Sequence, residues 1–373
     1  MTPKEIRPGW KPRDMADHYH TPRDLEGTGE IVAIIDLGEI VDPDELRKDF
    51  EKLGVPMPEL VIVDDHSPAQ PGLSPAAIET HIDLEIIGTL CPAATLRLYR
   101  CALNYSAMAN AISQAVKDEV HVISISWGAA EKDVSSGTIR KVEDALAAAT
   151  GAGITVCAAA GDFGAVGLID GKTMRPENTP NSRANCMFPA SSPNVLACGG
   201  TELVEASGKR QEIVWNNTAT GGLATGGGVS EQFDLPDWQA QLKVTSANQA
   251  GGTGRILPDV SALAAMQDWD FEIPGAPKKY FGGTSAVAPF YAALITMANQ
   301  MRVRKGKKRL GFLNSRLYDV ARNKGDVFES IRIGNNKVAP DGPGYEAEHG
   351  FDACTGWGVP RADKLISALV GLS

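Results

Sequence analysis

The stretch Gly282-Gly283-Thr284-Ser285-Ala286-Val287-Ala288-Pro289 begins a predicted helix and presents a serine at its start. The two glycines allow a sharp backbone turn, and the helix then continues through an apolar run, Phe290 to Met301. Near a helix start, backbone N–H groups lack intrahelical partners and can bind a developing negative charge. Ser285 therefore has the setting of an acyl-transfer nucleophile. The simpler alternative is that Thr284 or Ser285 serves only as a helix N-cap.

Upstream of this stretch, the chain alternates short β-branched runs with helical patterns. Strands are predicted at 31–36, 60–63, 95–99, 120–126 and 154–159, and helices at 42–53, 76–90, 105–117 and 138–150. Strands separated by such helices are joined by crossover connections, so the pattern predicts an α/β fold with a doubly wound, mainly parallel sheet and helices on both faces. No linker or repeat divides the chain, and residues 1–373 are expected to form a single domain.

Polar residues follow three of the predicted strands. Asp36 ends the first strand, Ser126-Trp127-Gly128 ends the fourth, and Gly161-Asp162-Phe163-Gly164 follows the fifth. Ligands of doubly wound sheets bind beyond the carboxyl ends of the strands. These residues are therefore candidates for a binding site at that edge of the sheet.

The predicted helix at 76–90 carries a pair of acids. Glu79 and Asp83 are four residues apart and project from one face, amid largely apolar neighbours. Like charges at this spacing repel, and burial disfavours ionisation, so at least one of the two carboxyl groups should have a raised pKa. Such a group suits a general base working in acid, and Ser285 is a nucleophile that needs a base. The alternative is a solvated acidic face that continues through Glu85.

Composition excludes several classes of protein. The chain has 373 residues, 43% of them hydrophobic, and a net charge of -10, which argues against nucleic acid as the main partner. The basic run Arg302 to Arg309 is interpreted as a solvated helix end. No apolar stretch is long enough to span a membrane. The N-terminal residues Met1 to Tyr19 are polar and contain three prolines, so they are not a signal peptide. Six cysteines without C-x-x-C spacing predict neither a zinc site nor a redox motif.

Several motifs resemble, in the same order, those of the sedolisins, the serine-carboxyl peptidases, and of their kumamolisin branch in particular. They are Glu79-Thr-His-Ile-Asp83, Ser124-Ile-Ser-Trp-Gly128, Ala159-Ala-Gly-Asp162, Phe188-Pro-Ala-Ser-Ser-Pro193, Leu196-Ala-Cys-Gly-Gly-Thr201, Gly226-Gly-Gly-Val-Ser230 and Gly282-Gly-Thr-Ser-Ala-Val-Ala-Pro289. The similarity extends from about Pro12 to the C-terminus. The resemblance implies a subtilisin-like fold and an acid-acting endopeptidase that hydrolyses polypeptides through an acyl-enzyme on Ser285.

The resemblance also implies a role for each site residue. Ser285 falls on the nucleophile, Glu79 on its general base, and Asp83 on the acid that supports Glu79. Asp162 falls on the oxyanion-stabilising aspartate, which can donate a hydrogen bond only while it is protonated. Trp127 falls on a tryptophan near the substrate cleft, although a buried core tryptophan is an equal alternative on composition alone.

Three positions depart from the family's pattern. Asp36 stands where the kumamolisin branch has a glutamate that extends the acidic network, so the network is expected to have a shorter reach or a bridging water. Phe163 replaces a small serine and adds bulk beside the cleft. Met187 replaces an aspartate, which predicts a shift of substrate preference toward apolar groups.

The chemistry requires no cofactor, but the resemblance implies a structural calcium site near the C-terminus. Its ligands would be Asp352 and the carbonyl groups of Ile331, Glu348 and Gly350. Ser330 replaces the first aspartate of this site, and losing a charged oxygen ligand lowers affinity for a hard cation. Calcium binding is therefore expected to be weak or absent, with Glu329 or Glu348 as a substitute ligand.

Two other functions remain open from the sequence. One is a subtilisin-like peptidase with an Asp36/His81/Ser285 triad. The argument against it is that His81 is predicted to point away from the helix face of Glu79 and Asp83. The other is a catalytically inactive, peptide-binding relative. The family has a large pro-segment without a counterpart here, so the chain is interpreted as a mature, secreted catalytic domain. The absence of a signal peptide leaves an intracellular location open, and a monomer is expected.

Overall fold

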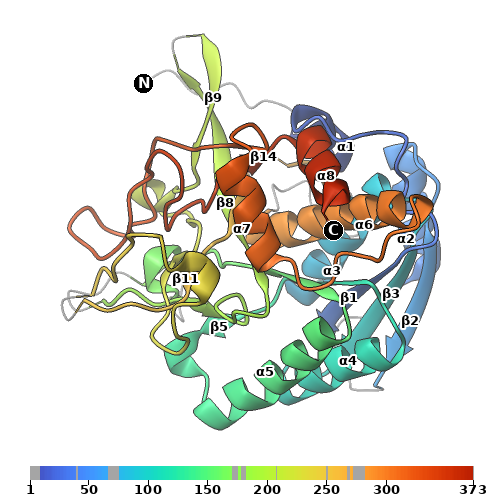
Figure 1. The fold of residues 1–373 in the computed structure, drawn as a ribbon, viewed down its shortest axis with the longest axis horizontal. Coiled ribbons are helices and arrows are strands. Elements are labelled where there is room, and N and C mark those ends of the chain that lie inside the picture. Colours follow the sequence, from blue (N-terminus) through green and yellow to red (C-terminus); the bar gives the residue numbers. More distant parts are fainter. Residues whose placement is uncertain are drawn as a thin grey trace.

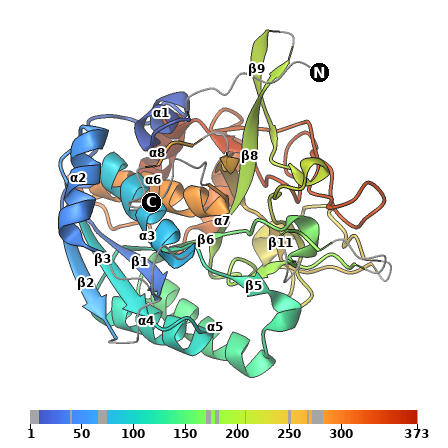
Figure 2. The same cartoon turned by 180° about the vertical axis from the view of Figure 1, so that it is seen from behind.

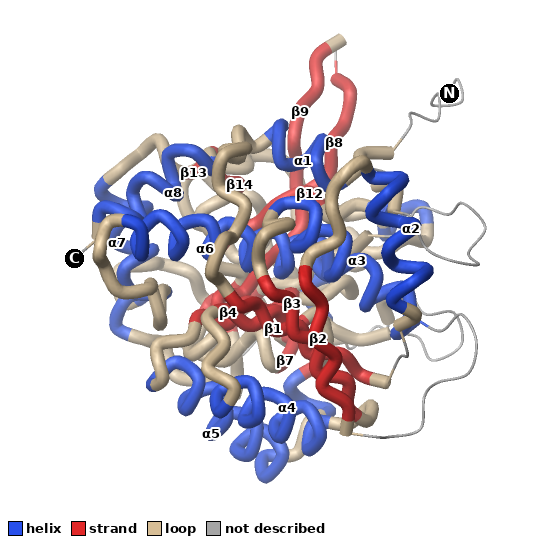
Figure 3. Tube along the Cα trace, turned by 90° about the vertical axis from the view of Figure 1, so that its right-hand side faces the viewer, coloured by secondary structure: helices blue, strands red, loops and turns tan. Residues whose placement is uncertain are grey.

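A central sheet crosses the molecule and carries helices on both faces (Figures 1 and 3). The computed structural model describes residues 9–38, 41–65, 75–169, 175–177, 182–206, 208–248, 251–266, 269–271 and 282–372. The eight strands of the main sheet are β1 (Ile31–Leu37), β2 (Glu59–Asp64), β3 (Thr95–Cys101), β4 (Val122–Ile125), β6 (Thr155–Ala159), β8 (Leu196–Ala206), β9 (Lys209–Val214) and β12 (Val260–Leu263).

The sheet has the predicted parallel topology. Its strands follow the order β12-β8-β6-β4-β1-β3-β2, and every neighbouring pair along this path is parallel. Strand β9 is the exception, because it pairs antiparallel with β8. The β8–β9 hairpin projects from the body of the molecule (Figure 2). The doubly wound, mainly parallel sheet expected from the sequence is thus confirmed.

Helices on the two faces enclose two separate cores. The helices are α1 (Pro12–His18), α2 (Pro43–Leu53), α3 (Pro75–Leu90), α4 (Tyr105–Lys117), α5 (Ser136–Gly151), α6 (Val287–Arg304), α7 (Asn314–Asn323) and α8 (Ala362–Gly371). Successive strand side chains point to opposite faces, so Val32 and Ile34 of β1 join the core of α3, α6 and α8, whereas Ala33 and Ile35 join the core of α4 and α5.

Helix α6 is buried along most of its length and packs against α3, β4 and β6. A helix that is apolar all round belongs in a core, as the run Phe290 to Met301 predicted. The predicted strand at 120–126 is shorter than expected. It covers only Val122–Ile125, because the N–H of Val120 bonds back to the carbonyl of Ala115 at the end of α4.

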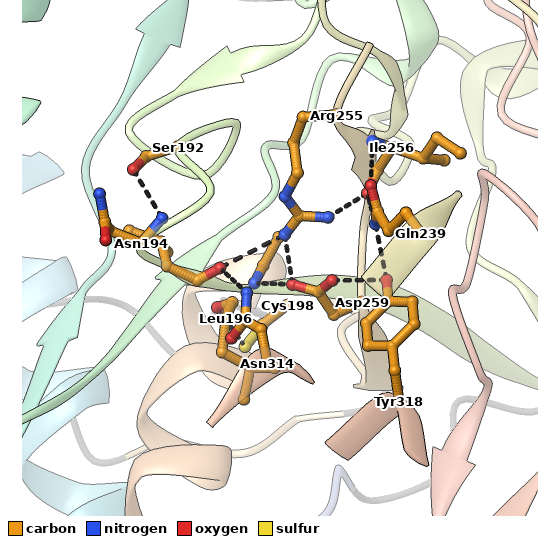
Figure 4. Close-up of polar contacts among 12 residues, drawn as sticks. Ser192, Asn194, Leu196, Cys198, Gln239, Arg255, Ile256, Asp259, Asn314 and Tyr318 are labelled. Carbon is orange, nitrogen blue, oxygen red and sulfur yellow. Dashed lines mark hydrogen bonds and ion pairs between the residues drawn. The ribbon is translucent and has the colours of Figure 1, made fainter. Parts of the chain in front are cut away.

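A fully buried polar network holds the segment between β9 and β12 (Figure 4). Asp259 accepts hydrogen bonds from Arg255 at 2.5 Å, from Tyr318 at 2.7 Å and from the backbone N–H of Ala197 at 2.7 Å. Gln239 donates to Tyr318 at 2.7 Å. The network therefore joins α7 and β8 to the small antiparallel sheet of β10 (Gly228–Val229) and β11 (Ile256–Leu257). Buried charges of this kind are tolerated when they are paired and hydrogen-bonded.

The small strands complete the architecture. β5 (Ala129–Ala130) pairs with β7 (Met187–Phe188), and β13 (Phe328–Glu329) pairs with β14 (Val359–Pro360), both antiparallel. Within the described ranges, no helix is long and apolar enough to cross a membrane.

Candidate active site

Three candidate residues lie at the carboxyl ends of adjoining parallel strands. Asp36 lies near the end of β1, Ser126 follows β4, and Asp162 follows β6. The register pairs Ile35 with Ile125, so Asp36 and Ser126 directly follow paired residues on neighbouring strands. Parallel strands present their carboxyl ends at one edge of the sheet, where α/β proteins bind ligands.

Ser285 sits in a single 3₁₀ turn, Thr284–Ala286, that leads into α6. The turn begins at Gly283, whose φ of 118° is a conformation that glycine adopts readily. It packs against α3 and β6 and leaves Ser285 7% exposed. Ala286 occupies the N-cap position of α6, and no side chain caps it. The interpretation of Thr284 or Ser285 as a mere N-cap is therefore wrong.

Hydroxyl groups make hydrogen bonds to the acids of α3 and β1, and one of them lies next to this turn. Ser126 donates to Oδ1 of Asp83 at 2.8 Å, and its hydroxyl oxygen also lies 3.4 Å from the backbone carbonyl oxygen of Ser285. Thr80 donates to Oδ1 of Asp36 at 2.6 Å. Asp36 also raises the pKa of Asp83 through its charge. The shorter side chain at position 36 thus still acts on the acidic pair, with Thr80 as a hydrogen-bond partner.

Both members of the acidic pair favour the protonated form. Burial and the charge of Asp83 raise the pKa of Glu79 well above its usual range, and the charge of Asp162 raises it further. Burial raises the pKa of Asp83 as well. The hydroxyl groups of Ser285 and Ser126 act on Glu79 in the opposite direction, because they stabilise its charged form. The expected raised pKa is thus present, and the alternative of a solvated acidic face is wrong for this pair.

The Glu79 carboxyl group retains a free acceptor. Its Oε1 atom is shielded from solvent and accepts no hydrogen bond from the described residues. Asp83, in contrast, is 1% exposed and accepts the hydrogen bond from Ser126. The arrangement combines a hydroxyl group, an acceptor close to it and a buried second acid, which is a set that can take a proton from Ser285.

Asp162 faces the nucleophile turn from the end of β6. Its Oδ1 atom accepts hydrogen bonds from the backbone N–H and the hydroxyl of Thr284, both at 2.8 Å. Burial raises the pKa of Asp162 to about 6, although both hydrogen bonds from Thr284 oppose the shift. In mildly acidic solution the group is therefore neutral and can donate a hydrogen bond.

The three remaining cleft candidates differ in exposure. Trp127 is partly buried and packs on the core formed by α4 and α5. Phe163 is partly exposed after Asp162. Met187 is 5% exposed and packs under the Asp162 loop, since a Cβ atom on Gly161 would lie 2.4 Å from its Cγ. Any influence of Met187 on a substrate would act largely through this loop.

The Asp36/His81/Ser285 triad stays an alternative to the carboxylate arrangement. Asp36 pairs with Thr80, and the groups that act on Glu79 are Asp83, Ser285, Asp162 and Ser126. His81 is buried on the same helix, two residues from Glu79. The hydroxyl of Ser285 thus has a carboxyl group as its neighbour.

The segment that resembles a calcium site is held by protein hydrogen bonds. The hydroxyl oxygen of Ser330 lies 3.2 Å from the carbonyl oxygen of Glu348 and 3.3 Å from that of Gly350, and it accepts the N–H of Gly350 at 2.9 Å. These are two of the carbonyl groups that a cation would bind. Asp352 accepts backbone N–H groups of Glu348, Cys354 and Thr355 at 2.8–3.1 Å. Ile331 is buried beside Ser330. Among the residues with described coordinates, no group of three or more His, Cys, Asp or Glu side chains could hold a metal ion.

A groove of about 1180 Å³ lies between α1, β9 and the C-terminal segment. Tyr19, Glu212, Ser330 and Trp357 are among its lining residues. Ser285, Glu79, Asp83 and Asp162 do not line it, so the groove is separate from the candidate active site. All six cysteines are free and buried, as small hydrophobic residues would be.

Sequence reasoning missed the roles of two hydroxyl residues. Ser126 connects Asp83 to the nucleophile turn, and Thr284 holds Asp162. Both lie inside motifs already noted, Ser124-Ile-Ser-Trp-Gly128 and Gly282-Gly-Thr-Ser285. The available signal was their position at a strand end and beside the candidate nucleophile, but a hydroxyl side chain gives no hint of its partner.

Comparison with known proteins identifies the family of the chain. The model of the family described as the subtilase family matches residues 74–309. Kumamolisin of Bacillus sp. (strain MN-32) is 39% identical over 369 residues, covering 97% of this chain and 64% of that protein. Tripeptidyl-peptidase 1 of Macaca fascicularis is 32% identical over 262 residues, covering 67% of this chain and 43% of that protein. The chain thus spans less than two thirds of the length of these relatives.

A solved structure shows the same architecture. Pseudomonas sedolisin, described as a serine-carboxyl proteinase complexed with two molecules of pseudo-iodotyrostatin, superposes with a TM-score of 0.82 at 26% sequence identity. The alignment covers 96% of this chain and 97% of that one. The resemblance seen in the motifs therefore extends over the described fold, and the chain belongs to the subtilase family, within which it is sedolisin- and kumamolisin-like.

Proposed function

We propose that this protein is an acid-acting serine-carboxyl endopeptidase that cleaves unfolded or extended polypeptides through an acyl-enzyme on Ser285. The observation that carries the proposal is the placement of the Ser285 hydroxyl beside Glu79, a carboxyl group with a shielded Oε1 atom and a pKa that is raised by desolvation and by Asp83. A base of raised pKa accepts a proton more readily than an ordinary carboxylate does. The sedolisin-like fold and family support the same reaction class.

Acylation begins with Glu79 ionised and Asp162 protonated. Glu79 takes the hydroxyl proton of Ser285 while the serine oxygen bonds to the scissile carbonyl carbon, and the carbonyl oxygen becomes an oxyanion. The protonated carboxyl group of Asp162 and the backbone N–H of Ser285 donate hydrogen bonds to that oxyanion. The C–N bond then breaks, and Glu79 returns the proton to the leaving amine. This step yields the acyl-enzyme and the first product.

Deacylation repeats the sequence with water as nucleophile. Glu79 takes a proton from water while the water oxygen bonds to the acyl carbon, and the same donors bind the second oxyanion. The ester C–O bond breaks, and Glu79 returns the proton to the oxygen of Ser285. Asp83 stabilises the protonated form of Glu79 in both steps, because its own charge makes a second negative charge nearby unfavourable.

Covalent labelling tests the nucleophile directly. The protein should react with a fluorophosphonate probe at mildly acidic pH, and peptide mapping should place the label on Ser285. Ser285→Ala should lose both the label and the digestion of an unfolded protein substrate. If the folded parent takes no label and digests no peptide library at any pH, the catalytically inactive, peptide-binding alternative would replace this proposal.

A further inference from the structure

Thr284 donates two hydrogen bonds to one oxygen of Asp162. Its hydroxyl and its backbone N–H both donate to Oδ1 of Asp162 at 2.8 Å, and its hydroxyl oxygen accepts the N–H of Gly161 at 2.9 Å. The residue is 1% exposed, so water does not compete for these bonds. Thr284 therefore connects the nucleophile turn to the loop after β6 through three hydrogen bonds.

The second oxygen of Asp162 has different surroundings. Oδ2 lies against Gly283, where an added Cβ atom would come within 2.3 Å of it. Among the described residues, no side chain or backbone group donates a hydrogen bond to Oδ2. The two oxygens of one carboxyl group are thus distinguished, with Oδ1 held by two donors and Oδ2 free beside the turn that carries Ser285.

From this asymmetry we infer that Thr284 is a positioning residue, which fixes Oδ1 of Asp162 as an acceptor and thereby places the acidic proton on Oδ2, the oxygen available to the oxyanion. An oxygen that accepts two hydrogen bonds has the role of the carbonyl oxygen of a neutral acid, so the O–H belongs to the other oxygen. Gly283 leaves the space in which Oδ2 sits. The inference rests on the proposed function, because it specifies how Asp162 performs its role.

The hydroxyl of Thr284 has a second effect, on the charge of Asp162. The donors of Thr284 stabilise the ionised form of Asp162 and so lower its pKa, whereas burial raises it. The ionisable group that faces Asp162 across the site is Glu79 of α3, which lies next to Asp83. Removing the hydroxyl donor should therefore raise the pKa of Asp162 and keep this residue protonated up to a higher pH. The orientation of the Asp162 carboxyl group should be lost at the same time.

The test compares Thr284→Val with Thr284→Ser. Valine keeps the shape but loses the hydroxyl, whereas serine keeps the hydroxyl. We expect Thr284→Val to lower kcat by up to roughly 100-fold with little change in KM, as misplacement of a reacting group does. The alkaline limb of kcat/KM should also move to higher pH. Thr284→Ser should restore both the rate and the position of the limb.

A merely structural role of Thr284 would lower activity without moving the alkaline limb. An unchanged limb in a folded Thr284→Val protein, or a limb moved to lower pH, would overturn the inference. If Thr284→Val does not fold, Thr284→Ala provides the same comparison with less steric demand. Asp162→Asn separates the two levels of argument. If Asp162→Asn kept an alkaline limb like that of the parent, Asp162 itself would be removed from the proposed function. If Asp162→Asn lost the alkaline limb but the limb of Thr284→Val did not move, only the role of Thr284 would be overturned.

Discussion

Ser126 donates a hydrogen bond of 2.8 Å to Oδ1 of Asp83, and its hydroxyl oxygen is also 3.4 Å from the backbone carbonyl oxygen of Ser285. One side chain at the end of β4 thus lies between the acids of α3 and the nucleophile turn. It also stabilises the charged forms of both Glu79 and Asp83, since its hydroxyl group lowers the pKa of each.

Ser126→Ala should therefore raise the pKa of the acidic pair. Because the pair then stays protonated up to a higher pH, its basic form appears only at that higher pH. The acidic limb of kcat/KM should therefore move to higher pH. Ser126→Thr retains the hydroxyl and is the matched control. An acidic limb that stays in place in Ser126→Ala, measured on a quenched-fluorescence peptide, would show that the hydrogen bond does not tune the base.

The catalytic trio should behave as a unit. Ser285→Ala, Glu79→Ala and Asp83→Ala should each lower kcat by a factor on the order of 10⁴ or more, with strongly non-additive effects in combination. His81→Ala should retain most of the activity, because the proposed base for the serine is the carboxyl pair and not the imidazole. If His81→Ala were folded and as inactive as Ser285→Ala, the Asp36/His81/Ser285 triad would replace the proposed mechanism.

The pH profile should be bell-shaped with its maximum below neutrality. On the alkaline side, Asp162 loses its proton as pH rises through its pKa of about 6, and a carboxylate repels the oxyanion. On the acidic side, the coupled pair Glu79 and Asp83 becomes fully protonated. Asp162→Asn supplies a donor that never ionises, so it should be less active than the parent but decline less at high pH. A parent maximum at or above neutral pH would contradict this account.

We propose that calcium contributes little to stability, because the hydroxyl of Ser330 occupies the position between the carbonyl groups of Glu348 and Gly350. A chelator should leave the melting temperature unchanged. Ser330→Asp should create a calcium site that isothermal titration detects, since a carboxylate supplies the charged oxygen that a hard cation requires. Ser330→Asn is the uncharged control. A large fall in the melting temperature of the parent with chelator would contradict the proposal.

The buried ion pair at Asp259 should be important for folding. Asp259→Ala leaves Arg255 charged and fully buried, which should lower the free energy of unfolding by about 3–5 kcal/mol. Asp326→Ala removes an exposed partner of Lys364 and should change stability little. Denaturant titration of both variants measures the difference. Equal, small effects would show that the network of Figure 4 is not a major source of stability.

The sequence by itself determined the fold class and the identity of the acidic pair. The alternation of strands and helices requires crossovers, which leave a parallel sheet as the expected product. Helical geometry places Glu79 and Asp83 on one face whatever surrounds them, and the turn at Gly283 follows from the local residues alone. These are properties of short segments, with periods of two or about four residues, and they can be predicted directly from the sequence.

Tertiary structure alone decided which hydroxyl group donates a hydrogen bond to which carboxyl group. Ser126 and Asp83 are 43 residues apart, and Thr284 and Asp162 are 122 apart, so no periodicity relates them. The register of β1 and β4 brings Ser126 to the acids, and the packing of the Ser285 turn on β6 brings Thr284 to one particular oxygen of Asp162. The pKa of Asp162 likewise depends on burial and on those donors, because desolvation is set by every segment that packs around the group.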